Sequence, residues 1–125
     1  MTHKPEGVDL QVAWGKCAGN RWCQLNTVDL SNSAFDVGGV YLIWHAGSTP
    51  RMVYVGQGAI RERLRDHLDD PRIQAYAKFG LYTTWANVQA AKRDGVEAYL
   101  AKVYDPLVGD RRPTAAPIAV NLPWD

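Results

Sequence analysis

Arginine and histidine side chains suited to phosphate contact are clustered in one predicted helix. Arg63 and His67 lie four residues apart, so they share one side of that helix. Arg61 and Arg65 are expected on the solvent side of the helix, and Arg72 follows shortly afterwards. A guanidinium group presents planar donors that can bind a phosphate through two hydrogen bonds. The alternative is a solvated surface of mixed charge, because acidic residues lie among these arginines.

Two tyrosines precede this helix, in two stretches whose β-branched and aromatic residues predict strands. Tyr41 lies in the stretch 39–47 and Tyr54 in the stretch 51–56. A hairpin of these strands places both phenol rings on one face only if the register pairs residues such as 41 and 56. Gly56 then ends the second strand, and the free amides at the helix start can hold a phosphate. The alternative for both tyrosines is half-buried packing within the sheet.

One acidic residue stands apart, because the chain contains only three glutamates. Glu97 lies in a predicted helix that begins near Asp94. The two residues are spaced as a capping box, in which the glutamate side chain binds a backbone amide at the start of the helix. The other interpretation of Glu97 is a carboxylate that serves a reaction.

The elements that must position these side chains follow the order β-β-α-α-β-α-tail. Apolar residues at 60, 64 and 68 predict the first helix, and Asp70-Pro71 predicts the start of a second that Gly80 ends. A third strand is predicted over 81–88, and the last helix has an apolar stripe at 96, 100 and 103. The tail is predicted to form a short edge strand at 118–120. This order favours an α+β or α/β sandwich.

The composition is that of one globular domain. The chain has 125 residues, of which 46% are hydrophobic and 22% charged, with a formal net charge of +1. This excludes disorder as the default and gives no general footprint for nucleic acid. No apolar run is long enough for a membrane helix or a signal peptide, so we expect a cytoplasmic protein without membrane contact. In that compartment Cys17 and Cys23 are expected to be free thiols, with a disulfide or a metal site as alternatives.

Five sequence features together resemble the GIY-YIG endonuclease superfamily in identity, order and spacing. They are Gly39-Val40-Tyr41, Tyr54-Val55-Gly56, the R-L-x-x-H motif that begins at Arg63, Glu97 on a later helix, and Asn121 near the end. The resemblance covers residues 38–123. It implies an α+β fold with a small three-stranded antiparallel or mixed sheet flanked by helices. Residues 1–37 are then an N-terminal extension packed on the core, and residues 38–125 a nuclease-like domain.

The resemblance also implies roles for the matching residues. Tyr41 and Tyr54 surround the attacking water, and Arg63 contacts the scissile phosphate. His67 occupies a position where the family often has His or Tyr. Glu97 is the single protein ligand of a divalent cation, usually Mg²⁺, with Mn²⁺ as an alternative. Asn121 is grouped with these catalytic residues as a structural or site-bordering residue.

Contacts with nucleic acid are expected at Gly56 and along the arginines. The expected residues are Gly56, Arg61, Arg63, Arg65, Arg111 and Arg112. For Arg111 and Arg112 the alternative is an exposed pair in a loop.

These features predict a metal-dependent endonuclease that hydrolyses phosphodiester bonds in nucleic acid, with DNA as the expected substrate. Mg²⁺ keeps most of its waters and needs only one or two carboxylates, so a single glutamate is sufficient. The first alternative is a nucleic-acid-binding or scaffold module with little catalysis, since the net charge is nearly neutral. The second is a toxin-like nuclease held by a cognate protein inhibitor. For the endonuclease and for the binding module alike, phosphate contacts should make the binding of nucleic acid strongly salt-dependent.

Overall fold

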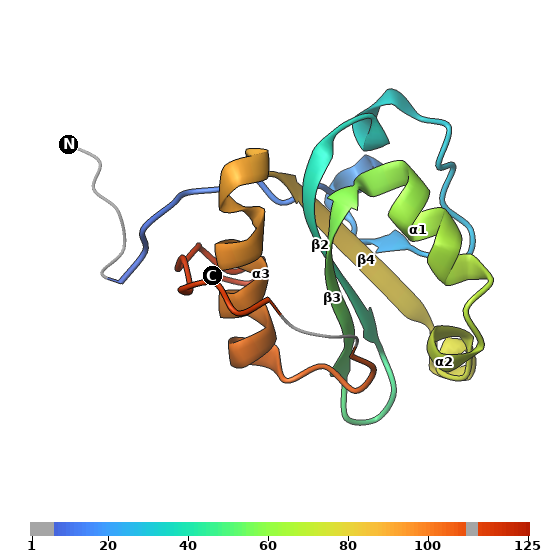
Figure 1. Cartoon of the computed structure of the whole chain (residues 1–125). Coiled ribbons are helices and arrows are strands. Elements are labelled where there is room, and N and C mark those ends of the chain that lie inside the picture. The colour runs from blue at the N-terminus through green and yellow to red at the C-terminus, as the bar shows by residue number, and fades with distance from the viewer. Residues whose placement is uncertain (1–6, 110–112) are drawn as a thin grey trace.

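The computed structural model describes residues 7–109 and 113–125 and has an α+β fold in three layers. The middle layer is an antiparallel sheet with strand order β1-β4-β2-β3, and these strands are Cys23–Gln24, Leu81–Asn87, Gly38–His45 and Arg51–Ala59. Helices α1 (Ile60–Leu68) and α2 (Pro71–Gln74) cover one face, and α3 (Ala90–Tyr104) covers the other (Figure 1). Short 3-10 turns span Ala18–Asn20, Ser33–Phe35 and Ala77–Phe79. The predicted α+β class is confirmed.

The hairpin of β2 and β3 has the register that places both tyrosines on one face. Tyr41 pairs with Gly56, and Tyr54 pairs with Ile43. Because side chains alternate along a strand, both phenol rings point towards the face that α1 covers. They belong to the same buried cluster as Leu64 of α1. The register condition derived from the sequence is therefore met.

The strand β3 is longer than predicted. It continues past Gly56 to Ala59, where its last residues pair with Gly38 and Gly39 of β2. Gly39 is required there, because a Cβ atom would overlap the carbonyl oxygen of Ala86 on the other neighbouring strand. The helix α1 begins at the next residue, Ile60, so the end of β3 fixes where α1 starts.

The fourth strand comes from the N-terminal segment, so the prediction of a three-stranded sheet is wrong. β1 has only two residues, which pair with Thr83 and Tyr82 of β4. Two residues carry no alternating pattern, so no strand is visible in the sequence. The same segment buries three large side chains in the core on the α1 side, namely Leu25, Leu30 and Phe35. Residues before 38 thus complete the sheet and its core.

The apolar stripe of α1 is confirmed in its first two positions. Ile60 and Leu64 have no exposed surface, and Leu68 is partly buried beside them. The next helix begins as predicted, because the side chain of Asp70 accepts a hydrogen bond from the amide of Arg72. It ends after one turn at Gln74 instead of continuing to Gly80.

The helix α3 starts four residues before the predicted position. It begins at Ala90, so Asp94 and Glu97 lie inside the helix and do not form a capping box. Gly95 explains the wrong prediction, because glycine is usually unfavourable within a helix. Here a Cβ atom at Gly95 would come within 2.6 Å of the Ile118 side chain, which packs across the helix at this point. The glycine that suggested a helix start is therefore explained by the close approach of the tail to the middle of α3.

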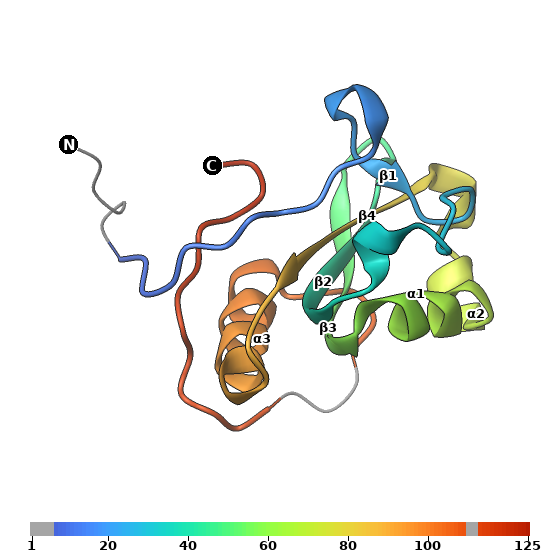
Figure 2. The same ribbon diagram turned by 90° about the horizontal axis from the view of Figure 1, so that it is seen from above.

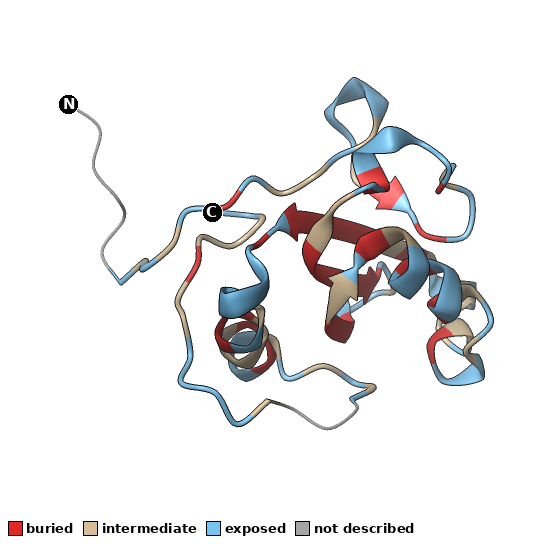
Figure 3. Ribbon diagram, turned by 45° about the horizontal axis from the view of Figure 1, so that its top comes forward, coloured by how far each residue is buried: buried red, intermediate tan, exposed pale blue. Residues whose placement is uncertain are grey.

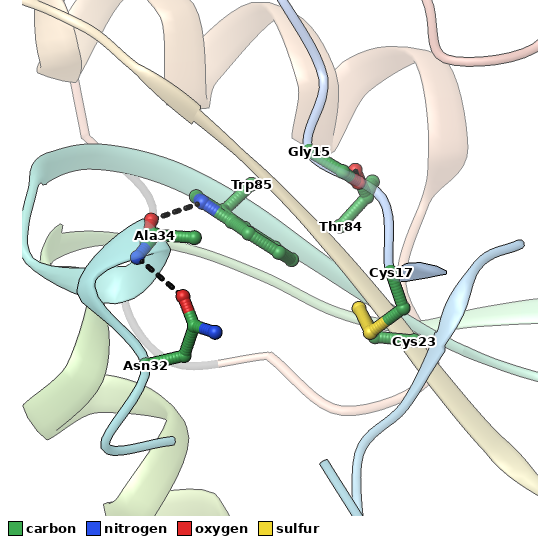
Figure 4. Close-up of a disulfide and its surroundings, with 7 residues drawn as sticks. All are labelled: Gly15, Cys17, Cys23, Asn32, Ala34, Thr84 and Trp85. Atoms are coloured by element: carbon green, nitrogen blue, oxygen red, sulfur yellow. Dashed lines mark hydrogen bonds between the residues drawn. A yellow bond between two sulfur atoms is a disulfide. The ribbon is translucent and has the colours of Figure 1, made fainter. Parts of the chain in front are cut away.

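Cys17 and Cys23 form a disulfide bond, so the prediction of free thiols is wrong. The bond closes a small loop just before β1, beside β4 (Figure 4). Nearby, the indole of Trp85 donates a 3.0 Å hydrogen bond to the carbonyl of Ala34. The hydroxyl of Thr84 donates one of 2.7 Å to the carbonyl of Gly15. The disulfide closes a loop within the N-terminal segment, and the two hydrogen bonds attach that segment to β4.

Reduction of this disulfide is expected to lower the free energy of unfolding by about 2 kcal/mol, since the closed loop is short. For a domain of this size the melting temperature should fall by roughly 8 °C. The measurement is thermal unfolding with and without dithiothreitol. The variant Cys17→Ser provides the control, because it should melt at the reduced temperature and ignore the reductant. A wild-type curve that does not move in reductant would contradict a stabilising bond.

The tail runs beside the N-terminal segment and not along the sheet edge (Figure 2). A single parallel bridge joins Leu10 and Val120, so the predicted edge strand at 118–120 is not formed. Asn121 fixes this contact, because its side chain exchanges two hydrogen bonds with the backbone of Val12, at 2.7 and 2.9 Å. Asn121 therefore has a structural role in joining the two ends of the described chain.

Burial follows the three layers (Figure 3). The central strands are almost wholly buried, and the outer sides of the helices are exposed. Within residues 7–109 and 113–125, none of the helices is long and apolar enough to span a bilayer.

Candidate active site

One pocket contains most of the residues that the sequence singled out. It has a volume of about 240 Å³ and lies at the β3 edge of the sheet, where β2, α1, α2 and α3 also contribute. Its lining residues are Tyr41, Tyr54, Gly56, Gln57, Arg63, Asp66, His67, Asp70, Arg72 and Glu97. The pocket combines side chains from helices on both faces of the sheet.

The pocket holds a hydrogen-bonded pair of ionisable side chains. The hydroxyl of Tyr41 lies 2.6 Å from Nε2 of His67. The ring of Tyr54 stacks on that of Tyr41 with centroids 6.0 Å apart, and its centroid is 4.4 Å from that of His67. All three side chains are buried, with exposed fractions of 9% or less. Such a contact can pass a proton between the phenol and the imidazole.

Gly56 is the residue that makes room for this pair. It lies opposite Tyr41 in the hairpin. A Cβ atom at position 56 would overlap the hydroxyl of Tyr41 and lie 2.5 Å from its Cζ atom. The glycine is therefore needed for the phenol to reach His67, and its role in the site is steric.

Two arginines line the pocket, and an aspartate holds each of them. Arg63 forms a 2.5 Å ion pair with Asp66, and Arg72 binds Asp70 through Nε at 3.2 Å and Nη2 at 2.8 Å. The hydrogen bond from the Arg72 side chain keeps the pKa of Asp70 below its usual value of 3.8, so this carboxylate is charged at neutral pH. Both arginine side chains are about half exposed, at 49% and 51%. They are oriented and still accessible to an anionic ligand.

Glu97 reaches the pocket from α3. Its Oε2 atom accepts a 2.8 Å hydrogen bond from the amide of Gln57, which also donates to Asp94 at 2.6 Å. Among all the residues that the structure describes, including this pocket, His, Cys, Asp and Glu side chains form no group of three or more that could hold a metal ion. A divalent cation would thus have one or two carboxylate ligands and several waters, which is an ordinary arrangement for Mg²⁺. The carboxylate oxygens of Glu97 are ligands of the kind that Mg²⁺ binds.

Two of the predicted nucleic-acid contacts are placed away from the pocket. Arg61 was expected on the solvent side, but its side chain is only 20% exposed and binds the N-terminal segment. It donates to the carbonyls of Leu30 at 2.8 Å and Asn32 at 3.1 Å. Arg65 is exposed on α1 and does not line the pocket.

Of the three remaining predicted residues, one lies away from the pocket and two lie outside the residues that the structure describes. Asn121 was grouped with the catalytic residues, but it lies in the contact between the tail and Val12. That contact is made by packing of distant segments, which spacing alone does not reveal. Arg111 and Arg112 lie outside the described residues, so their predicted phosphate contacts stay predictions.

The pocket also contains four residues that were not among the predicted site residues: Gln57, Asp66, Asp70 and Arg72. Of these, the sequence placed only Arg72 in the basic cluster suited to phosphate contact. Asp66 lies three residues after Arg63 on α1, which is a spacing for an ion pair. Asp70 was predicted only as a helix cap. Gln57 carried no sequence signal, because an isolated glutamine in a strand is usually a surface residue.

A second and larger pocket, of about 420 Å³, contains none of the predicted site residues. It is lined by Trp44, Pro50, Arg51, Met52, Tyr104 and Trp124. Burial raises the pKa of Tyr104, with a further contribution from nearby Asp125. That phenol therefore stays neutral, and the pocket is predominantly apolar and aromatic. Its lining lacks the combination of carboxylate, guanidinium and imidazole found in the smaller pocket.

Comparison with models of known protein families, with curated proteins and with solved structures finds no match for this chain. The resemblance to the GIY-YIG superfamily therefore depends on the sequence motifs alone.

Proposed function

We propose that this protein is a metal-dependent endonuclease that hydrolyses phosphodiester bonds in nucleic acid, with DNA as its substrate and Mg²⁺ as its cofactor. The observation that supports this proposal is the shared pocket of the Tyr41–His67 pair, Arg63 and Glu97. These side chains come from three elements and meet at one edge of the sheet. They supply a proton acceptor, a phosphate-binding cation and a carboxylate for a divalent ion.

The Tyr41–His67 pair would activate water. The pair is buried and joined at 2.6 Å, so the phenol oxygen can take a proton from a water molecule as His67 takes the phenol proton. This relay avoids a free phenolate, which tyrosine with its ordinary pKa of about 10 forms rarely at neutral pH. Tyr54 packs against both rings and restricts their orientation.

The arginines would bind the phosphate. The guanidinium of Arg63 offers parallel donors to two phosphate oxygens, which stabilises the additional negative charge of the transition state. When bound at Glu97, the divalent ion would contribute Lewis-acid stabilisation of the same charge. Glu97 would be the residue that holds this cation in the pocket.

A plasmid assay tests this proposal. Supercoiled DNA is incubated with the protein in Mg²⁺, in Mn²⁺ or in EDTA. We expect nicked or linear DNA only with the divalent ion, and at least a hundredfold slower conversion by Tyr41→Phe. Tyr82→Phe is the matched control, since Tyr82 stacks on Trp44 and does not line the pocket. Wild-type protein that leaves the DNA intact in both metal ions would contradict the proposal.

The second candidate is a nucleic-acid-binding module with little catalysis, which the near-neutral net charge favours. In the same assay it predicts salt-sensitive binding of DNA without cleavage. Cleavage that a tightly bound cellular protein suppresses would instead indicate the toxin-like nuclease with a cognate inhibitor.

Arg72 is expected to bind a phosphate beside the one that Arg63 contacts. The change Arg72→Ala should weaken DNA binding about tenfold, since it removes charged hydrogen bonds. It should also reduce the slope of log Kd against log salt concentration by about 0.9, the value for one phosphate contact. The measurement is fluorescence anisotropy in a salt series. Arg51→Ala, at the other end of β3, is the control and should leave the slope unchanged. An unchanged slope in Arg72→Ala would exclude the contact.

A cytoplasmic site of action remains part of the proposal. The Cys17–Cys23 disulfide is the observation against it, because the cytoplasm keeps most thiols reduced. Alkylation of thiols in intact cells, followed by mass measurement of the protein, shows whether the two cysteines are reduced or joined in the disulfide. Two alkyl groups on the protein would support the cytoplasm, and none would contradict it.

A further inference from the structure

The side chain of Gln57 connects the strand β3 to the helix α3 at the pocket. Its amide nitrogen lies 2.8 Å from Oε2 of Glu97 and 2.6 Å from Oδ1 of Asp94. An amide group has two N–H donors. Both are therefore used on carboxylates of one helix, and the amide plane is fixed by two anchors.

The position of Gln57 in the sheet explains this reach. Gln57 pairs with Val40, and Val40 and Val55 belong to the core cluster on the α3 side. Side chains alternate along a strand, so Gln57 points to the α3 face while Gly56 before it lies opposite Tyr41 on the α1 face. The two halves of the pocket thus lie on opposite faces of β3, and Gln57 is the link from that strand to Glu97.

The helix alone would not hold Glu97 in one place. Asp94 and Glu97 are three residues apart on α3, so two negative charges lie on the same side of the helix and repel each other. An amide that donates to both carboxylates offsets this repulsion and brings them to one point. Asp94 is exposed and Glu97 half-buried, so the outer carboxylate anchors the amide and the amide orients the inner carboxylate.

We propose that Gln57 is a positioning residue for Glu97, and that Asp94 is the second anchor of its amide. The proposal rests on the function proposed above, in which Glu97 holds a divalent cation. Partners that orient a metal ligand typically change metal affinity by 10- to 100-fold when they are removed. Gln57 should therefore control metal affinity without contacting the substrate.

Mn²⁺ binding to the purified protein, followed by electron paramagnetic resonance in the absence of DNA, tests this role. Gln57→Met keeps the length of the side chain and removes its donors, so the Kd for Mn²⁺ should rise 10- to 100-fold. Gln89→Met is the matched control, because Gln89 is exposed at the start of α3 and makes no side-chain cap. Its Kd should equal that of the wild type. Circular dichroism melting establishes that each variant is folded.

A second variant separates an anchor from a metal ligand. Asp94→Asn keeps an oxygen that can accept the Gln57 hydrogen bond and loses the charge. The Kd for Mn²⁺ should therefore stay within about threefold of the wild type if Asp94 acts only as an anchor. A loss as large as that of Gln57→Met would overturn this part of the proposal.

Plasmid cleavage by the same proteins completes the test. Gln57→Met should require 10- to 100-fold more Mn²⁺ for half-maximal cleavage, with an unchanged KM for DNA. If the wild type binds Mn²⁺ and cuts DNA, and Gln57→Met does both equally well, only the positioning role is overturned. If the wild type neither binds Mn²⁺ nor cuts, the proposed function fails, and the positioning role fails with it.

Discussion

Replacing Glu97 with glutamine is expected to lower kcat for DNA cleavage by about a thousandfold, equivalent to about 4 kcal/mol of transition-state stabilisation. The change keeps the size of the side chain and removes the charge that would hold the divalent ion in the pocket. Glu97 is half-buried at the surface of α3, so the melting temperature should change little. The measurement is single-turnover cleavage at saturating Mg²⁺.

Glu62→Gln is the matched control for this prediction. Glu62 is exposed in the first turn of α1 and does not line the pocket. Its removal should leave the rate within about twofold of the wild type. A rate for Glu97→Gln above a tenth of the wild-type rate would show that this carboxylate is not the cation ligand.

The second large effect is expected from Gly56→Ala, which adds one methyl group to the pocket. That group would overlap the Tyr41 hydroxyl, so the phenol must move away from His67. Misplacement of a reacting group by about 1 Å can cost 100-fold in rate. Forcing a methyl group into a packed site also costs about 1–3 kcal/mol in stability. We therefore expect cleavage to fall about 100-fold, together with a lower melting temperature.

Gly109→Ala is the control, because a Cβ atom at Gly109 has no neighbour within 4 Å among the described residues. It should cleave and melt as the wild type does. Gly56→Ala protein that cleaves at the wild-type rate would show that the Tyr41–His67 contact is dispensable. Melting and cleavage are measured on the same sample. A lower melting temperature with an unchanged cleavage rate would therefore assign Gly56 to packing and not to catalysis.

The side chains of the pocket could be predicted where they depend on local periodicity. The stripe of α1 follows from helical spacing, and alternation along the strands gives the condition on the hairpin register that places both tyrosines on one face. The structure meets that condition, and the pocket brings Tyr41, Tyr54 and His67 together. Arg61 shows the limit of this reasoning. Helical spacing places it on the solvent side, but the N-terminal segment covers that side and takes its hydrogen bonds.

Features that depend on distant segments could not be predicted. The sequence around Gly95 is typical of a helix start, yet Gly95 lies inside α3. A glycine is found there because Ile118 of the tail packs closely against the helix at this point. The disulfide depends on a turn that brings Cys17 back to β1, and composition does not encode such a turn. Gln57 likewise becomes part of the site only when β3 and α3 are packed together.

The central claim is hydrolysis of a phosphodiester bond at this pocket, and the isotopic content of the products tests it most directly. A defined DNA duplex is digested by the wild type in Mg²⁺ and water enriched in ¹⁸O, and the fragments are weighed by mass spectrometry. The proposed mechanism predicts one ¹⁸O atom in the terminal phosphate at each cut, and no cuts in EDTA. Intact DNA in Mg²⁺, or fragments whose terminal phosphates carry no ¹⁸O, would contradict it.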